Sequence, residues 1–427
     1  MPAFTLPDLA ALANSLVAMP NAAARPAARL ISIWEITQWI LPMAPEHLRR
    51  VLAATPDLPQ GQAGSEGGTR WFTAAEVAAL RTHFAQGPRK GRYHPQRPAQ
   101  ALAPLITLTA PQGQAGRSTA TLHLATAAAL AGYRVLVIDA DPAGRLAQGL
   151  GTDSDQTGLG VLGLIARDAA RHLRQSNQSR LDRGEAPLAM DAVQSAALGL
   201  RAQDLIRPTL WPGLDVLPAA AAMMQADLQI GRWRQAQARW QPWRALAEAI
   251  SSDGLRQAYD LILCDTGRGL GPLAVSMLAS ADVLLAPLPL TLGALSRLGA
   301  GLHALAGGLA AVQAEAQITA QALGQTLPAL HWGALAVLPT RAGPDSAVPL
   351  AHYVAALPGT LLPNPLPEIP QIAAGSATQF YDLDYRAVGR LIYAPQREAT
   401  EAAWRGVADL LTQLWAAQTT VQSQLAL

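Results

Sequence analysis

Residues 112–119, QGQAGRST, combine glycines, hydroxyl side chains and one basic side chain, the residue types that cradle phosphate groups. Gly113 and Gly116 allow the backbone to turn tightly and to approach a phosphate closely. The alanine- and leucine-rich segment that follows is typical of a helix, and the free N–H groups and the dipole at the start of a helix attract anions. The sequence therefore predicts a site for a phosphate-bearing ligand at this loop.

Acidic residues stand at the ends of two apolar runs elsewhere in the chain. Asp139 and Asp141 alternate just after the run 135–138, and Asp265 follows directly on the run 261–264. Carboxylates in such places are either ordinary caps or parts of a site, and the presence of a phosphate loop favours a site. We therefore expect the three carboxylates to lie close to the loop.

The segments around these residues have the order strand, loop, helix, strand, which makes a parallel βαβ unit. The unit runs from the apolar stretch 105–109 through a helical segment ending near Gly132 to the stretch 135–138. Further apolar runs at 281–288 and 332–339 alternate with helical stretches at 291–313 and 344–357. This alternation predicts the α/β fold class, with a doubly wound, mostly parallel sheet.

Three motifs together resemble the ParA/MinD superfamily of deviant-Walker ATPases: QGQAGRST, then VLVIDADPAG, then YDLILCDTGRGLG at 259–271. The resemblance implies a P-loop NTPase-like core that uses ATP and Mg²⁺. In this group the loop typically reads Lys-Gly-Gly-x-Gly-Lys-Ser/Thr. The present chain departs from that pattern, because Gln112 replaces the signature lysine, Gln114 replaces a glycine and Arg117 replaces the phosphate-binding lysine.

The resemblance also implies a role for each matching position. Ser118 and Asp265 would hold Mg²⁺, the latter through water, and Asp141 would help to position the attacking water. The catalytic positions would be Asp141, Arg117 and Gln112. Thr119 would lie against the inner phosphates, and Thr340 and Arg341 would lie near the base. The full set of nucleotide-binding positions would be Gly113, Gln114, Ala115, Gly116, Arg117, Ser118, Thr119, Asp139, Thr340 and Arg341.

The departures in the loop affect catalysis more than fold. A guanidinium is planar and wider than an ammonium group, so Arg117 keeps the charge but not the geometry of the lysine. Gln112 carries no charge and cannot stabilise the phosphates of a partner subunit. Losing one such electrostatic group typically costs on the order of a hundredfold in rate, so we expect slow ATP hydrolysis or none. Arg268, where the family usually has proline, either supplies a positive group nearby or faces solvent.

The region before the core contains short helical pieces with an extended interruption. Two candidate helices lie around Pro42 and Pro45, an extended piece covers 70–72, and Thr73 caps a helix with Glu76 three residues later. This order resembles the MerR-like winged helix of RepA-type plasmid partition ATPases, a layout whose second helix enters the major groove. The alternative is a three-helix piece that binds no DNA.

Composition changes divide the chain into four parts. We predict a helical arm at 1–28, a winged-helix domain at 29–86, a basic Pro/Gly linker at 87–103 and a ParA-like core at 104–427, which includes a helical insertion at 152–208. The arm either packs on its own domain or forms a dimer contact. Three tryptophans at 233, 240 and 243 and an apolar stripe on the helix 401–416 are expected to pack in the core.

Basic residues outside the loop are candidates for contacts with DNA phosphates. Each contact of this kind would add to the salt dependence of binding. The alternative is that these side chains form solvated charged faces. The candidates are Arg49, Arg50, Arg70, Arg89, Lys90, Arg92, Arg386, Arg390 and Arg397.

The overall composition narrows the possible classes of protein. The 427 residues are 50% hydrophobic, enough for a sizeable core, and a net charge of +2 does not identify a polyanion partner. Cys264 is the single cysteine, which excludes disulfides within one chain. The start lacks a signal-peptide pattern, and the nearest apolar span, 271–298, is interrupted by Asp282 and two prolines. We expect a cytoplasmic protein with no membrane segment.

The resemblance covers residues 30–415 with gaps and implies a RepA-type plasmid or chromosome partitioning protein. Such a protein is a nucleotide-dependent homodimer that binds DNA, associates with the nucleoid, works with a ParB/RepB-like centromere-binding partner and represses its own operon. Two alternatives stay open. One is a catalytically inactive pseudo-ATPase that binds DNA or regulates other proteins, and the other is a ParA-like positioner of protein cargo.

Overall fold

The computed structural model describes Pro7 and residues 29–425, except 65–68, 88–89, 96, 111–114, 153–157, 238, 268 and four positions between 323 and 328. The predicted arm, apart from Pro7, lies outside the described residues. The same holds for Gln112, Gly113, Gln114, Arg89 and Arg268.

A seven-stranded sheet forms the centre of the molecule, with the strand order β10-β9-β4-β8-β5-β7-β6. Among the described strands of this sheet, every neighbouring pair is parallel except β6 with β7. The predicted doubly wound, mostly parallel sheet is therefore confirmed. The strands are β4 (Leu105–Leu108), β5 (Val135–Asp139), β6 (Arg207–Pro208), β7 (Leu214–Leu217), β8 (Leu261–Asp265), β9 (Val283–Pro289) and β10 (Ala334–Thr340).

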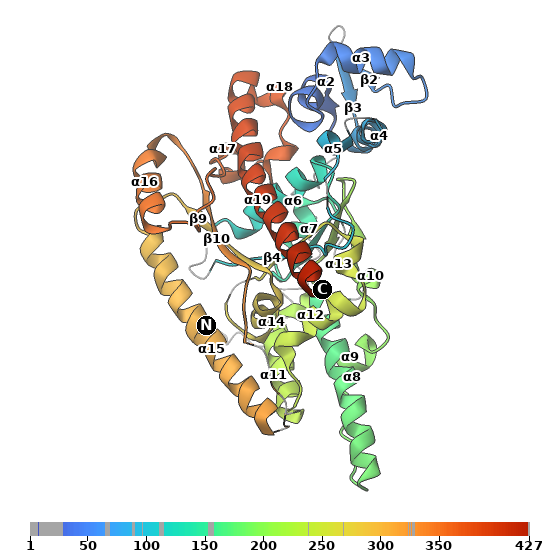
Figure 1. The fold of residues 1–427 in the computed structure, drawn as a ribbon, viewed down its shortest axis with the longest axis vertical. Helices are drawn as coiled ribbons and strands as arrows, with labels where there is room; N and C mark the ends of the chain where they lie inside the picture. The colour runs from blue at the N-terminus through green and yellow to red at the C-terminus, as the bar shows by residue number, and fades with distance from the viewer. Residues whose placement is uncertain are drawn as a thin grey trace.

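Helices cover both faces of this sheet (Figure 1). Successive side chains of a strand point to opposite faces, so Ile106 and Leu263 join a core with α6 (Arg117–Leu130) and α19 (Arg390–Leu425), whereas Leu105 and Ile262 join the other core. That second core contains α8 (Val161–Asp182), α12 (Pro242–Ser252) and α14 (Pro272–Ser280). Burial on both faces explains why the strands are continuous apolar runs.

A small N-terminal unit, residues 29–93, precedes the sheet. Its three-stranded antiparallel sheet has the order β1-β3-β2. Thr73 and Glu76 form the predicted capping box, since the Glu76 N–H donates to Thr73 Oγ1 at 3.1 Å and the Thr73 N–H donates to the Glu76 carboxylate at 2.7 Å. The elements are β1 (Ile31–Ser32), α2 (Ile33–Glu35), η1 (Ile36–Ile40), α3 (Pro45–Ala54), β2 (Gln62–Ala63), β3 (Arg70–Phe72), α4 (Ala74–Ala85) and α5 (Lys90–Tyr93).

The segment predicted as a linker, 87–103, contributes to the core instead of only bridging two domains. Tyr93 is 6% exposed and Ala103 is fully buried. Arg97 forms an ion pair with Asp260 at 3.4 Å. Phe72 of the N-terminal unit and Trp404 of α19 belong to one continuous apolar cluster. The N-terminal unit is therefore packed onto the core, at the end where α18 (Tyr385–Val388) and the start of α19 lie (Figure 1).

The remaining helices confirm most of the local predictions. The predicted insertion contains α8 and two short helices, and Trp233, Trp240 and Trp243 are buried as expected. Trp404 and Trp415 of α19 are also buried, which confirms that the C-terminal helix packs on the sheet. The other elements are α7 (Arg145–Gly149), α9 (Ala192–Ala197), α10 (Ala202–Leu205), η2 (Ala221–Gln225), α11 (Ala226–Ala236), α13 (Leu255–Ala258), α15 (Ala294–Ala322), η3 (Pro344–Ser346), α16 (Ala347–Ala356), α17 (Pro370–Ala373) and η4 (Phe380–Asp382).

Helix α15 corrects one expectation. Among the described residues it alone has the length and apolar composition of a membrane-crossing helix. The sequence pattern instead indicates 271–298 as the nearest apolar span. The helix lies along the outside of the molecule (Figure 1) and buries few side chains, among them Leu298, Leu305 and Leu309. Its alanine and glycine content gives it a low charge without making it a core helix.

Candidate functional site

The topology of the sheet brings the predicted site residues to one edge. Asp139, Asp265 and Thr340 are the last residues of β5, β8 and β10, and α6 begins directly after the loop that follows β4. Because the carboxyl ends of parallel strands meet at the same edge of a sheet, residues far apart in sequence converge there. Asp139 and Asp265 are direct neighbours across the β5–β8 pair.

Arg117 and Ser118, the first two residues of α6, both bind Asp265. Arg117 Nε donates to Asp265 Oδ1, and Ser118 Oγ donates to Oδ2 at 2.6 Å. The second carboxylate lies farther away, since Arg117 Nη2 is 4.0 Å from Asp141 Oδ2. Arg117 is 9% exposed and Asp265 is fully buried. The structure thus brings together four of the residues that the sequence singled out, with Arg117 at their centre.

Asp139 braces the turn that carries Asp141. Its Oδ1 accepts from the Asp141 N–H at 2.9 Å, and its Oδ2 accepts from the Leu146 N–H at 3.3 Å. Burial, followed by the nearby Asp265 carboxylate, raises the pKa of Asp139 to about 8. Its side chain is fully buried, so in this arrangement Asp139 positions the backbone at Asp141, and its contact with a nucleotide stays a prediction.

The residue that precedes α6 has a left-handed backbone. Gly116, its N-cap, has φ +75°, a left-handed conformation that glycine adopts without strain. A Cβ at this position would meet nothing within 4 Å, so the glycine is required by the backbone angle and not by lack of space. Ala115 is buried, and Thr119 is partly exposed.

The arrangement does not fit a directly bound Mg²⁺. The Ser118 hydroxyl and the Asp265 carboxylate are hard oxygen ligands of the kind Mg²⁺ prefers. However, Oδ1 of Asp265 also accepts from the Gly267 N–H at 3.3 Å, so both carboxylate oxygens are already engaged. Among the residues described, no group of three or more His, Cys, Asp or Glu side chains is placed to hold a metal. The Arg117 guanidinium supplies the positive charge at this position.

The end of β10 leads to residues that line a cavity. Thr340 is 5% exposed, and its Oγ1 has no hydrogen-bond partner within the described part of the chain. Arg341 is exposed and has φ +55°, an uncommon backbone conformation for a residue with a side chain. The adjoining cavity, about 1040 Å³, is lined by Gly343, Pro344, Pro367, Glu368, Pro370 and neighbouring residues. Its size suits a nucleoside.

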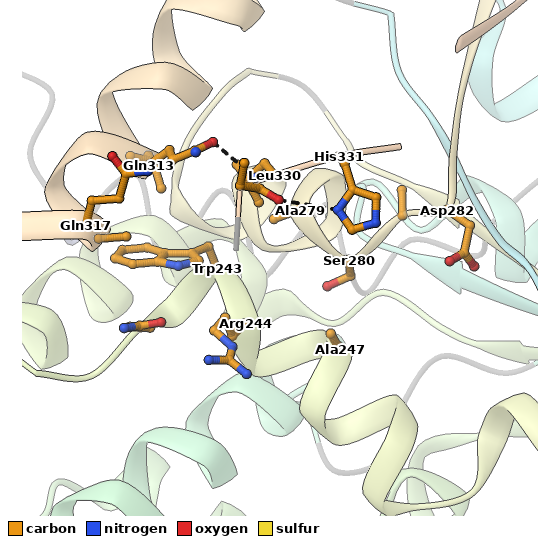
Figure 2. Close-up of a pocket in the computed structure, with 15 residues that line it drawn as sticks. Trp243, Arg244, Ala247, Ala279, Ser280, Asp282, Gln313, Gln317, Leu330 and His331 are labelled. Carbon is orange, nitrogen blue, oxygen red and sulfur yellow. Dashed lines mark hydrogen bonds between the residues drawn. The ribbon is translucent and has the colours of Figure 1, made fainter. Parts of the chain in front are cut away.

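A second cavity, about 290 Å³, lies at the opposite edge of the sheet (Figure 2). Asp282 and His331 line it, and they precede β9 and β10 at the amino ends of these strands. Trp243 of α12 and Gln313 of α15 form other parts of its wall. None of the predicted site residues that the structure describes lines this cavity. It is therefore separate from the candidate site.

The candidate DNA-contacting residues fall into three groups. Arg49, Arg50, Arg70 and Arg92 are exposed on the N-terminal unit, as the prediction requires, and of Lys90 only the helical backbone of α5 is described. Arg386 and Arg390 are exposed, but they stack on Trp71 and Trp34 at 4.1 and 3.8 Å from the ring centroids. These two arginines therefore hold the N-terminal unit against α18 and α19.

The prediction for Arg397 is wrong. Its side chain is 1% exposed, and its Nε lies 2.9 Å from Oε1 of Glu401, one helical turn later. The guanidinium also lies over the Tyr381 ring, 4.5 Å from its centroid. A side chain in this position cannot reach a DNA phosphate. The sequence shows the charge of this residue but not its burial.

Sequence reasoning missed a buried histidine on α6. His123 is 3% exposed; its Nδ1 lies 2.6 Å from the Thr119 carbonyl oxygen, and its Nε2 accepts from the Phe380 N–H at 3.1 Å. The only local signal is that it falls four residues after Thr119. Phe380 is 257 residues away, and no sequence pattern indicates that contact.

We predict that acidification destabilises the fold through His123. Burial lowers the pKa of His123 from 6.5 to about 4, so the unfolded chain takes up this proton at a higher pH than the folded chain. The stability that depends on the neutral ring is complete above pH 6.5 and falls by about 3 kcal/mol as the pH approaches 4. His123→Gln should flatten the pH dependence of the free energy of unfolding in this range. An unchanged slope would contradict the assignment.

Comparison with known proteins gives relatives for the central part of the chain. A family model described as an AAA domain matches residues 103–317. "Chromosome partitioning protein ParA" of Caulobacter vibrioides is 30% identical over 184 residues, 43% of this chain and 55% of that protein. "Putative replication protein A" of Sinorhizobium fredii is 26% identical over 273 residues, 60% of this chain and 56% of that protein. The chain spans about half the length of the curated relatives it matches.

One solved structure extends the likeness to nearly the whole chain. It is described as "Partition Protein", has a TM-score of 0.59 and 18% sequence identity, and the match covers 95% of this chain and 97% of that one. At this identity the likeness concerns the fold.

Proposed function

Because the chain belongs to the AAA-domain family and is of the ParA/MinD partition ATPase type, we propose that it segregates DNA as a nucleotide-dependent homodimer. In this proposal ATP binds at the loop before α6, and the ATP-bound dimer binds DNA. A ParB/RepB-like partner acts on the dimer, and the protein is cytoplasmic and associated with the nucleoid. The chain also represses its own operon.

The observation that carries the proposal is the convergence at the carboxyl edge of the sheet. The Gly116 turn, Ser118 and Asp265 stand together, and Asp139 holds the turn with Asp141 next to them. The cavity beyond Thr340 offers space for a base on the same edge. This combination of an anion-binding helix start and an adjacent cavity supports a nucleotide as the ligand.

A second candidate function rests on the contact between Arg117 and Asp265. The guanidinium holds the carboxylate that would act with a metal ion, and it occupies the position of a cation. A protein arranged in this way can keep the fold, the dimer and the DNA contact without turning over nucleotide. This is the pseudo-ATPase alternative, and it is consistent with the replacement of both family lysines.

The N-terminal unit is the proposed DNA-reading part. Its order of strand, two helices, paired strands and helix supports the winged-helix interpretation, with α3 as the reading helix. Arg49 is 53% exposed, and Arg50 is exposed beside it on α3. Arg49 also lies 3.5 Å from Oε1 of Glu46, but an exposed pair of this kind is weak, so both side chains can approach a phosphate backbone.

We expect the double variant Arg49→Ala/Arg50→Ala to weaken DNA binding about tenfold near physiological salt and to lower the slope of log affinity against log salt by about 2. Two phosphate contacts and their released counterions would be lost. Fluorescence anisotropy with a labelled duplex measures both quantities. The matched control is Arg174→Ala/Arg183→Ala, which removes two exposed arginines at α8, far from the N-terminal unit (Figure 1). Equal losses in both variants would contradict an N-terminal DNA site.

Isothermal titration calorimetry separates the two candidate functions. Titration of ATP, with and without Mg²⁺, into the full chain should show one site per subunit if the loop binds nucleotide. Binding that does not depend on Mg²⁺ would support the pseudo-ATPase alternative, because Arg117 would then serve as the cation. Absence of binding under both conditions would overturn the proposal of a nucleotide-dependent switch.

A further inference from the structure

Helix α6, which begins at the proposed phosphate loop, is bonded at its carboxyl end to the N-terminal unit. Arg81 of α4 is 7% exposed, and its guanidinium donates to the carbonyl oxygens of Leu130, Tyr93 and Ile40, the last two at 2.6 and 2.8 Å. Leu130 is the last residue of α6. A cation at the carboxyl end of a helix is favoured by the helix dipole. Arg81 thus connects three backbone segments by hydrogen bonds.

In its middle, α6 is bonded to the segment 379–381. Besides the contact of His123 with the Phe380 N–H, Thr126 Oγ1 donates to Gln379 Oε1 at 2.8 Å. Gln379 and Phe380 are fully buried. The other ring nitrogen of His123 faces the carbonyl oxygen of Thr119, in the first turn of α6. The ring therefore connects the first turn of α6 directly to the backbone at 380.

Residues 380 and 381 are in turn bonded to the N-terminal unit. The Tyr381 carbonyl oxygen accepts from Arg29 Nε at 2.5 Å. Arg29 Nη2 donates to Glu35 Oε1 at 2.7 Å and to the Tyr393 hydroxyl at 3.0 Å. Glu35, at the end of α2, is fully buried. The chain of contacts from Thr119 to α2 consists of hydrogen-bonded groups that are buried or partly buried.

The partners of His123 fix its tautomer. The Thr119 carbonyl oxygen can only accept, so Nδ1 carries the proton, and the Phe380 N–H can only donate, so Nε2 is unprotonated. A neutral histidine meets both demands at once. Glutamine places its amide where Nε2 stands and can accept from Phe380, but it has no donor at the Nδ1 position, one atom closer to the backbone and beside Thr119, and leucine can do neither.

We propose that His123 is a positioning residue that couples the phosphate loop to the N-terminal unit. A shift of the first turn of α6 moves the Thr119 carbonyl oxygen, and the ring transmits the shift to residues 380 and 381 and through Arg29 to α2. Arg81 holds the other end of α6, so the helix cannot move without the N-terminal unit. The proposal rests on the proposed function for its biological meaning, because nucleotide and DNA are the two ligands that would be coupled.

Hydrogen exchange followed by mass spectrometry on the full chain tests the coupling without any ligand. We expect His123→Leu to increase the exchange rates of amides in 379–393 and 29–40 at least tenfold, with β4 and β8 unchanged. The matched control is Thr121→Val on the same helix, since Thr121 is fully buried and donates to the carbonyl oxygen four residues earlier but has no bond to 379–381. Unchanged exchange at 29–40 in His123→Leu, or equal changes in the control, would overturn the proposal.

His123→Gln covers the case in which the leucine variant does not fold. It should keep the protection of residues 380 and 381 and lose that of the first turn of α6, which a purely space-filling role would not produce; equal protection at both places would refute the coupling. Adding ATP to the wild-type chain then distinguishes a failure of this proposal from a failure of the proposed function. If ATP changes no exchange rate, the nucleotide site fails, while the effect of His123→Leu on 29–40 still decides the coupling.

Discussion

Replacing both Gln112 and Arg117 by lysine is expected to raise the rate of ATP hydrolysis on the order of a hundredfold over the parent chain. The Arg117 guanidinium binds Asp265, and its Nη2 lies 4.0 Å from Oδ2 of Asp141. A lysine has one slim ammonium group that can leave the carboxylate and reach between phosphates. Freeing Asp265 next to Ser118 would give these oxygen ligands back to a metal ion. Release of phosphate in the presence of Mg²⁺-ATP measures the gain.

Two further variants assign the gain to the site. Arg117→Lys alone should give a smaller increase, because the second positive charge at position 112 is still missing. Adding Asp265→Asn to the double lysine variant should return the rate to the parent level. If the parent chain already hydrolyses ATP as fast as the double variant, the interpretation that Arg117 slows ATP hydrolysis is wrong.

Arg397→Leu is expected to lower the free energy of unfolding by about 3–5 kcal/mol. The substitution leaves Glu401 buried without its partner, and it also removes the cation above the Tyr381 ring. Burial raises the pKa of Glu401, with Arg397 acting in the opposite direction. Without Arg397 that pKa rises further, so the loss should be smaller at pH 5, where Glu401 can take up a proton, than at pH 8. Urea unfolding at the two pH values measures both effects.

The matched control is Arg405→Leu on the same helix. Arg405 lies 2.7 Å from Glu398, but both side chains are more than half exposed, so solvent screens the pair and the cost should be at most about 1 kcal/mol. Equal losses for Arg397 and Arg405 would show that the buried pair contributes no more to stability than an exposed one.

The fold and the centre of the site were predictable because their signals are local. Continuous apolar runs identify strands buried on both faces, and β4, β5, β8, β9 and β10 all lie where such runs occur. Asp139 and Asp265 end two of these runs, and parallel pairing brings strand ends together whatever their separation in sequence. The position of the phosphate loop before a helix follows from the same pattern.

The roles of the arginines were not predictable from such patterns. Arg397 has a carboxylate four residues later, which in sequence looks like a surface pair, yet both groups are buried. Arg386 and Arg390 lie against Trp71 and Trp34, more than 300 positions away, and no local feature indicates these contacts. The binding of Arg117 to Asp265 likewise depends on the tertiary structure, although the replaced lysine already indicated an altered site.

The most direct test of the account is the DNA affinity of the full chain with and without ATP, measured by fluorescence anisotropy at fixed salt. We predict that ATP raises the affinity for a nonspecific duplex at least tenfold and that the protein becomes a dimer in the same concentration range. An affinity and an oligomeric state that are the same with and without ATP would contradict the proposed nucleotide-dependent partition function.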